Sequence, residues 1–512
     1  MCIITANVRR RKLVLIRGLT YFFFLIISVI EALSEGTGKI GSGRQKTIRT
    51  ISERQSFFMT GKLKIHNPLR ELYEEAELPQ AIRRSLNFIL IGNICGALCG
   101  IICGGGTTAM VGLATSMGAD DLTFAFLTAI PQAAALLQIP FSMLVNRTHK
   151  RKKYMLTIGL FSRALWLLFG LIPFIIPRGT TVNYQLFTLL FLLGISSCCG
   201  AVINPCWFPW LSDLSPDRIR SRWLSVRDVI MSIINILAGL GIAFLLDHLP
   251  PETKYVIIFI LGGTVGMLDM ISFAFCKEVF TAPPQKLKFG QVIGGILKNK
   301  PFMHFMIFWT VWCFTANMSG TYMSPYSMNV MGLNFTQIMI FGTVASCIAA
   351  IFTVQRWGKA MYHFGSRNVM LVSCIGAAVT PAFYLFSSPG NIWPTLLHNF
   401  FGAMFWCGAN LSANNMQLSI SAPETRPSYI AVFSCVTALL GVTLGSLSAG
   451  GLLKVLDASQ LFTGWLDRYK MLFLIATTLR LSAVLLLVPR MERDRDATPK
   501  DLIRAILRIR KM

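Results

Sequence analysis

The sequence is poor in charged residues and lacks the short motifs typical of soluble enzymes. Asp, Glu, Lys and Arg make up 14% of its 512 residues, whereas a soluble domain has about 25%. It contains no His-Glu metal motif, no nucleophile elbow and no phosphate-binding loop. We therefore expect a chain that lies largely in lipid and is not an enzyme.

Acidic residues are the scarcer charged class, because 48 Lys and Arg stand against 23 Asp and Glu, which gives a formal charge of +25. Such a charge can indicate nucleic-acid binding. Here the basic residues lie in short loops between apolar runs and build no single face, so we expect no nucleic-acid partner. Basic loops beside apolar runs are typical of the cytoplasmic side of a membrane protein.

The 13 cysteines show no disulfide or metal pattern. All except Cys2 lie in or beside apolar segments, where cysteine behaves as a small hydrophobic residue. Cys95, Cys99 and Cys103 are four apart, but no His or carboxylate joins them, so we expect no metal site. Glycines at positions 92, 96, 100 and 104 have the same spacing and predict close approach of a second helix.

Long apolar runs dominate the chain after residue 84. A helix that crosses the bilayer needs about 20 apolar residues, and twelve segments satisfy this by inspection. We expect an all-α membrane protein with twelve transmembrane helices. The first six segments are 85–114, 121–145, 154–177, 183–207, 225–247 and 254–276. The second six are 302–329, 335–356, 368–388, 391–417, 429–453 and 469–489.

The basic loops predict the orientation of these helices. Clusters of Lys and Arg follow the second, fourth and sixth segments, at 147–153, 218–227 and 286–300, whereas the loop 118–121 carries two acids. By the positive-inside rule, both ends of the twelve-helix unit are expected in the cytoplasm. We expect a multi-pass protein of the plasma (inner) membrane, surrounded by lipid and monomeric.

The predicted domains follow from the same pattern. They are an N-terminal extension (1–58), a cytoplasmic lead-in helix (59–84), a six-helix bundle (85–277), a cytoplasmic linker (278–300), a second six-helix bundle (301–490) and a basic tail (491–512). The extension resembles a signal or anchor sequence. Three interpretations stay open for it: a cleaved signal, an interfacial segment, or an upstream extension before a start at Met59.

Two related motifs occur in corresponding places of the two bundles. Residues 142–152 read SMLVNRTHKRK and residues 358–367 read GKAMYHFGSR, each after the second helix of a bundle. Both resemble the signature of the major facilitator superfamily, Gly-x-Leu-x-Asp-Arg-x-Gly-Arg-Lys. The loop 213–220, DLSPDRIR, is similar to the loop after the fourth helix of sugar-porter-like members, and 422–432 is its weaker counterpart. Recurrence at a fixed interval strengthens both resemblances.

The resemblance implies two pseudo-symmetric six-helix bundles that tilt about a central cleft. Charged residues of the motif loops would then pair and separate as the cytoplasmic side closes and opens; the alternative is that they only fix topology. The predicted gating residues are Asn146, Arg147, Lys150, Arg151, Asp213, Asp217, Arg220, Gly358, Gly365, Arg367 and Arg426.

The resemblance also implies that the first, fourth, seventh and tenth helices line the cavity. Amide and aromatic side chains there can hydrogen-bond and stack a small polar solute, or they can join helices instead. His398 could instead face the surface of the bundle. The predicted cavity residues are Asn93, Asn204, Trp309, Trp312, Asn317, Tyr322, His398, Asn399, Trp406 and Asn410.

Charged residues inside the apolar segments need partners. Arg163 on the third helix and Asp269 on the sixth are predicted to form a structural ion pair, with proton coupling by Asp269 as the alternative. Arg480 on the twelfth helix has no obvious acidic partner in its half. We expect no cofactor, and either H⁺ or Na⁺ fits as the coupling ion.

These observations predict a secondary active transporter that moves a small polar organic solute by alternating access, with a sugar or glycoside as a candidate. A drug or metabolite exporter of the same fold is the nearest alternative. A membrane sensor without transport activity is the alternative from another class.

Overall fold

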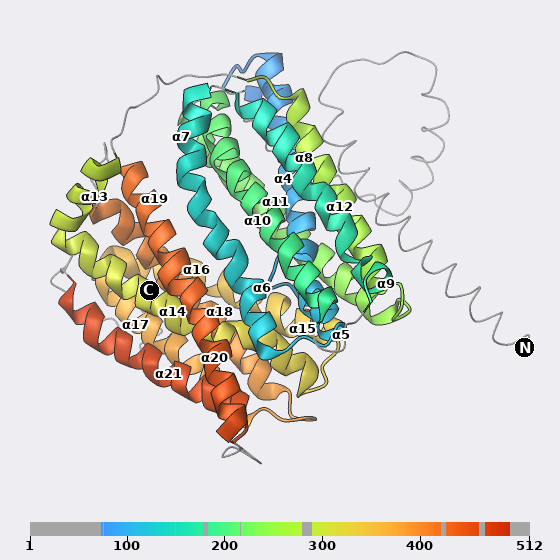
Figure 1. Ribbon diagram of the computed structural model, residues 1–512. Helices are drawn as coiled ribbons and strands as arrows, with labels where there is room; N and C mark the ends of the chain where they lie inside the picture. Colours follow the sequence, from blue (N-terminus) through green and yellow to red (C-terminus); the bar gives the residue numbers. More distant parts are fainter. Residues whose placement is uncertain are drawn as a thin grey trace, which may run out of the picture.

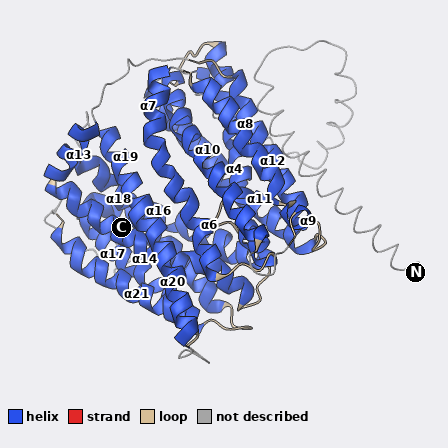
Figure 2. Cartoon of the chain, in the orientation of Figure 1, coloured by secondary structure: helices blue, strands red, loops and turns tan. Residues whose placement is uncertain are grey.

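The structure is a computed structural model that describes residues 73–74, 76–148, 150–177, 183–215, 217–278, 289–420, 426–459 and 466–491. The predicted extension at 1–58 and the tail after residue 491 lie outside the described residues. Throughout the described part the ordered elements are helices (Figure 2), and the sole β-type pairing in it is an isolated bridge between Ser388 and Asn391.

Helices occupy each segment that the sequence predicts to be apolar and membrane-spanning. In the first half they are α4 (Gln80–Cys103), α5 (Thr108–Ser116), α6 (Asp121–Ala134), η2 (Ala135–Leu137), α7 (Gln138–Thr148), α8 (Arg151–Phe169), α9 (Ile172–Ile175), α10 (Tyr184–Leu214), α11 (Asp217–His248), α12 (Lys254–Ser272) and η3 (Phe273–Phe275).

The second half repeats the pattern after a short linker helix, α13. Its elements are α13 (Phe289–Lys298), α14 (Lys300–Asn329), α15 (Phe335–Met339), η4 (Ile340–Val344), α16 (Ala345–Phe364), α17 (Ser366–Val379), η5 (Thr380–Phe386), α18 (Trp393–Ile420), α19 (Arg426–Val436), η6 (Thr437–Thr443), α20 (Leu444–Ser459), α21 (Arg468–Leu487) and η7 (Val488–Arg490).

Eight helical stretches in the described residues are long and apolar enough to cross a membrane. The predicted segments at 121–145, 154–177, 302–329 and 391–417 are also helical but do not meet that combined test of length and hydropathy. The two in the second half, α14 and α18, have 30 and 28 residues, so composition rather than length separates them. Both carry many amide, hydroxyl and aromatic side chains.

Local side chains explain where several helices begin and end. Asp120 accepts a hydrogen bond from the backbone N–H of Thr123 at 2.9 Å and so caps α6. Asn334 and Gln337 form a capping box at the start of α15. Gly365, with φ +84°, ends α16 in a conformation that only glycine adopts easily.

The helices form two groups, α4–α12 and α14–α21, which lie side by side in Figure 1. In the first group α12 packs against α4 and α8, and in the second α18 packs against α16 and α17. The predicted glycine stripe explains the tight α4–α12 contact: a Cβ added at Gly96 would lie 3.0 Å from the Asp269 carboxylate. Gly100 and Gly104 do not take part in this contact, because a Cβ on Gly100 would meet no atom within 4 Å and one on Gly104 would meet only Thr107 and Gly100.

Candidate substrate pathway

Asp121, at the start of α6, joins the two halves. Its carboxylate accepts a hydrogen bond from the Tyr469 hydroxyl at 2.6 Å and lies 3.0 Å from the Arg468 guanidinium. The Tyr322 hydroxyl donates to the backbone carbonyl of Asp121 at 2.7 Å. The Asp121 side chain is only 7% exposed, so these partners, rather than water, satisfy its charge.

A second link connects α11 to α15. The Asp247 carboxylate accepts hydrogen bonds from the backbone N–H groups of Phe335 and Thr336, at 2.9 and 2.8 Å. These are the free N–H groups of a helix N-terminus, where a negative charge is favourable. Asp247 therefore acts as a helix cap supplied by the opposite half of the molecule.

Asp120 and Lys454 form a more exposed link between the halves, with the Lys454 Nζ 3.3 Å from the carboxylate. Burial raises the pKa of the Asp120 carboxyl, but hydrogen bonds from Thr123 and the Lys454 ammonium outweigh it. The pKa is therefore held below its ordinary value of 3.8. Both side chains are 54% exposed, so this pair contributes less than the Asp121 cluster.

Small residues let the halves approach between these links. A Cβ added at Gly450 on α20 would lie 3.0 Å from the Ala125 methyl on α6. One turn further along α6, the Thr443 hydroxyl donates to the Ala129 carbonyl at 3.4 Å. We call this region the seam, and it comprises Asp120, Asp121, Asp247, Tyr322, Phe335, Thr336, Thr443, Lys454, Arg468 and Tyr469 together with the residues of α6 that they contact.

The basic motif loops lie at the opposite ends of the same helices. The Arg151 guanidinium pairs with Asp213, and the Lys152 backbone N–H donates to Glu278 at 3.1 Å, all within the first half. In the second half the Arg367 guanidinium donates to the Pro489 carbonyl at 2.7 Å. Each of these three contacts joins residues of the same half.

The predicted gating residues are distributed as follows. Arg151, Asp213 and Arg367 contact their own half, Lys150 is exposed, and Gly365 ends α16. A Cβ added at Gly358 would meet no atom within 4 Å. The side chains of Asn146, Arg147, Asp217, Arg220 and Arg426 lie outside those that the structure describes. Their gating role stays a prediction.

Most predicted cavity amides bond to nearby groups of the protein. Asn317 donates to the Cys313 carbonyl at 2.8 Å, and Asn399 donates to the Thr395 carbonyl at 3.0 Å. Asn93 donates to its own helix and accepts from Arg227 at 3.0 Å. Asn410 is exposed, and the side chain of Asn204 lies outside the described set.

The aromatic candidates fall into two groups. Trp309 and Trp312 are buried on α14, and the Trp312 ring lies 5.3 Å from the Trp406 ring on α18. Tyr322, by contrast, belongs to the seam through its bond to Asp121. His398 is buried at 8% exposure with its Nδ1 2.8 Å from the Thr380 carbonyl, so it does not lie on the surface of the bundle.

The buried charges have definite partners. An Arg163 guanidinium nitrogen lies 3.4 Å from an Asp269 carboxylate oxygen. Arg480 instead points at neutral acceptors on α14, the Ala316 carbonyl at 2.7 Å and the Ser319 hydroxyl at 2.6 Å. Helix carbonyls can satisfy a buried guanidinium without an acid. The sequence prediction considered acidic partners alone and therefore missed these acceptors.

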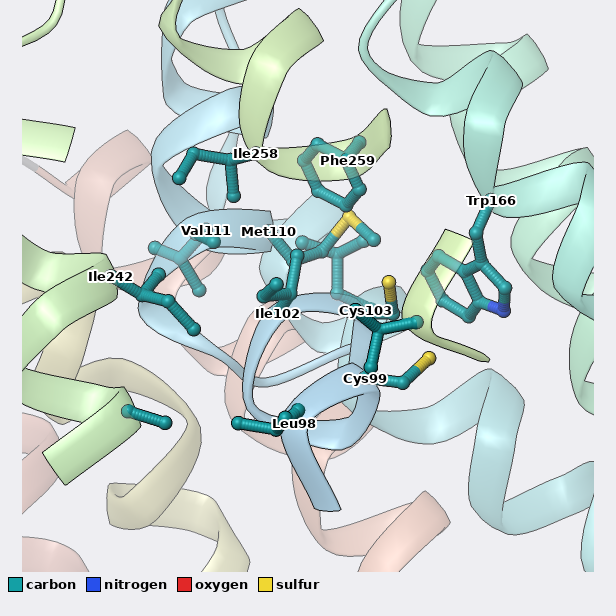
Figure 3. Packing of buried hydrophobic residues seen from close by; sticks show 14 of the residues in the cluster. Leu98, Cys99, Ile102, Cys103, Met110, Val111, Trp166, Ile242, Ile258 and Phe259 are labelled. Carbon is teal, nitrogen blue, oxygen red and sulfur yellow. The ribbon is translucent and has the colours of Figure 1, made fainter. Parts of the chain in front are cut away.

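A cavity of about 260 Å³ lies inside the first half, between α4, α6–α7, α8 and α10. Its polar lining side chains are Gln138, Ser162, Arg163, Trp166, Ser196 and Ser197. Figure 3 shows Trp166 beside Cys99 and Cys103, which also line it. The sequence prediction missed this cavity because only the first, fourth, seventh and tenth helices were expected to line one. Polar residues in three of the apolar segments were the signal that could have indicated it.

Comparisons with known proteins agree with this arrangement. Similar solved structures include a mutant of the nucleoside transporter NupG, with TM-score 0.63 and 12% identity over 79% of this chain and 100% of that one. An auto-inhibited POT family peptide transporter matches with TM-score 0.64 and 12% identity over 81% and 99% of the two chains. A bacterial homologue of the human lysosomal transporter Spinster, inward-facing and unoccupied, matches with TM-score 0.57 and 14% identity over 84% and 100%.

No curated protein matches the sequence significantly. At such low identities the solved structures share the fold alone. The sequence itself carries the assignment, because the family model described as Major Facilitator Superfamily matches residues 92–446, the greater part of the chain. This chain is therefore a membrane transport protein of the Major Facilitator Superfamily.

Proposed function

We propose that the chain is a secondary active transporter that moves a small polar organic solute by alternating access between its two halves. The observation that carries the proposal is the seam. Its three charged contacts between the halves, at Asp121, Asp247 and Lys454, lie toward one end of the helices. An arrangement joined at one end is what a rocking mechanism requires of one of its two states.

The positive-inside rule supports the direction. The basic loops lie at the end opposite the seam, and this end should face the cytoplasm. The seam would then close the outer side, and the state described would be inward-facing. Weak links of this kind suit a transporter, because the two states must stay close in free energy to interconvert.

The polar solute is supported by the helices of the second half. The half-buried Trp406 ring, which packs on the buried Trp312 ring, offers a stacking surface, and the exposed Asn410 offers a hydrogen-bonding amide. A sugar or glycoside is one candidate, from the loop after the fourth helix and the amides of α18. H⁺ or Na⁺ would serve as the coupling ion, and the protein would work as a monomer in the plasma (inner) membrane.

Uptake and counterflow in proteoliposomes test the proposal. Purified protein is screened against sugars, nucleosides and organic acids, first by thermal stabilisation and then by flux. Saturable uptake that requires an imposed H⁺ or Na⁺ gradient, and stops when that gradient is removed, supports a secondary transporter. Gradient-driven efflux of apolar drugs would favour the exporter. Absence of flux for every solute, together with ligand-dependent binding of a partner protein, would favour the sensor.

A further inference from the structure

The cavity inside the first half is lined by a positively charged side chain. Among the residues that the structure describes, Arg163 is the only charged one that lines it. Its partner Asp269 is not part of the lining, and the Asp269 side chain is 7% exposed, against 24% for Arg163. The Asp269 carboxylate is turned toward α4, where it lies 3.0 Å from the position of a Cβ on Gly96. The cation therefore faces the cavity and the anion does not.

Two hydrogen-bond donors at this cavity find no acceptor in the described part of the chain. The Trp166 Nε1 and the Arg163 Nε are both buried without a hydrogen-bond partner there, and the Trp166 residue as a whole is 6% exposed. A buried donor without a partner destabilises the protein, because it has lost its hydrogen bond to water. Two such donors side by side on α8, one turn apart, indicate a place where an acceptor binds.

Two of the remaining polar groups of the lining are already engaged with each other. The Ser162 and Ser196 hydroxyls lie 3.1 Å apart and pair with one another. Water can fill a polar cavity, and one of about 260 Å³ also admits a small organic group in place of several waters. An acceptor that carries negative charge gains most, because it meets both the indole N–H and the guanidinium.

We propose that this cavity binds the carboxylate group of the transported solute. A carboxylate has only acceptors, and it matches the planar guanidinium with parallel hydrogen bonds that are stronger than neutral ones. The indole N–H supplies a third donor. The inference rests on the proposed transport function and deepens it: whatever the rest of the solute, it carries an acid.

Two glycines make the cavity accessible to a chemical test. A Cβ added at Gly100 on α4 or at Gly200 on α10 would meet no atom within 4 Å, and both residues line the cavity. A cysteine at either position should therefore fold normally and place its thiol in the cavity. Gly241 on α11 offers a matched control, because a Cβ there also meets no atom within 4 Å and it is not part of the lining.

The experiment measures the charge preference of the cavity with reagents, so it does not require the natural solute. Purified Gly200→Cys protein is treated with a methanethiosulfonate that carries a sulfonate and, separately, with one that carries a trimethylammonium. Tandem mass spectrometry of the peptide follows modification of residue 200 and distinguishes it from modification of the neighbouring Cys198 and Cys199. We expect the ratio of the sulfonate rate to the ammonium rate to be about tenfold higher than at Gly241→Cys, as for a preference of about 1.4 kcal/mol.

Two conservative changes test whether the named donors cause the preference. Trp166→Phe keeps the stacking on Phe169, whose ring lies 4.5 Å away, but removes the indole N–H. Arg163→Lys keeps a cation for Asp269 but removes the Nε donor. Each should reduce the ratio several-fold. A ratio equal to that of the Gly241→Cys control, or one unchanged by both substitutions, would overturn the proposal. Gly100→Cys serves as a second reporter if Gly200→Cys fails to fold.

Protection then tests the carboxylate itself. Lactate should slow modification of Gly200→Cys, whereas its neutral amide, lactamide, should not; equal effects of the two, or none, would refute the carboxylate assignment. Flux is measured separately. If the chain moves no solute but shows the expected labelling ratios, the proposed transport function is refuted and the anion preference of the cavity is not. If it moves solute but shows no anion preference at residue 200, the cavity proposal alone fails.

Discussion

Replacing Asp121 with Asn should shift the protein toward the state in which the seam is open. Asn is nearly the same size and keeps one oxygen for the Tyr469 hydroxyl, but it removes the negative charge that faces Arg468 at 3.0 Å. Hydrogen bonds to charged groups contribute about 1.5–3 kcal/mol, against about 0.5–1.5 kcal/mol for neutral ones. The change therefore weakens two contacts of the closed seam and few contacts of the open one.

The size of the shift follows from the burial of the two partners. Asp121 is 7% exposed, but the Arg468 side chain is 33% exposed, so solvent screens part of the interaction. We expect a loss of about 2 kcal/mol, which changes the ratio of the two states about 30-fold. A population of about 99:1 in favour of the closed seam would fall to about 3:1.

Distances between spin labels measure the shift directly. One pair, at Glu252 and Trp393, spans the end that carries the seam, and a second, at Lys153 and His363, spans the basic end; all four residues are exposed. Noncanonical amino acids would carry the labels, because the chain has 13 cysteines. In Asp121→Asn the first distance should gain a longer component and the second a shorter one.

Asp457→Asn is the matched control. The Asp457 carboxylate lies 3.2 Å from the same Arg468 guanidinium, but its side chain is 67% exposed. An exposed pair contributes about 0–1 kcal/mol, so both distance distributions should stay near those of the wild type. Distances unchanged in Asp121→Asn, or an equally large shift in Asp457→Asn, would refute the assignment of the seam.

Three further predictions follow from the same contacts. Asp247→Ala leaves two N–H groups at the start of α15 without their cap and should open the seam by about 1 kcal/mol in the same distance measurement, whereas Asn334→Ala, which removes a cap from the same half, should not. Arg480→Met leaves acceptors on α14 without their donor and should cost about 3 kcal/mol of stability, seen as a lower unfolding temperature with or without solute; an unchanged temperature would show that the hydrogen bonds to Ala316 and Ser319 do not hold α21. The depressed pKa of Asp120 means that its link to Lys454 is complete above its ordinary pKa of 3.8 and lost as pH falls through the lowered pKa. The seam distances of wild type and Asp120→Asn should therefore differ at neutral pH and converge in strong acid, and a difference that grows on acidification would contradict this sign.

The positions of the helices could be predicted from local sequence. Apolar runs of about 20 residues specify helices independently of the rest of the fold, and residues such as Asn334 before a run and Gly365 after one mark its limits. The glycine spacing on α4 likewise predicted close approach of a second helix, because a face of small residues lowers the distance at which two backbones can pack; the structure shows that this helix is α12. The family resemblance followed from motifs of about ten residues.

The partners across the molecule could not be predicted in this way. Asp121 and Tyr469 are 348 residues apart, and the loop before α6 appeared in the sequence only as an acidic turn. Tyr322 was expected to line a cavity and instead bonds to Asp121, since its side chain points toward the other half. Which face of a helix meets which neighbour depends on its rotation and tilt, and these follow from the packing of all its neighbours.

The sequence by itself determined an all-helical membrane chain of two related halves with its basic loops on one side, because hydropathy and loop charge act segment by segment. Only the tertiary structure decided which end of the helices joins the halves and that Arg163 and Trp166 share a cavity. Those properties arise from residues on different helices, brought together by side-chain packing that no single segment encodes.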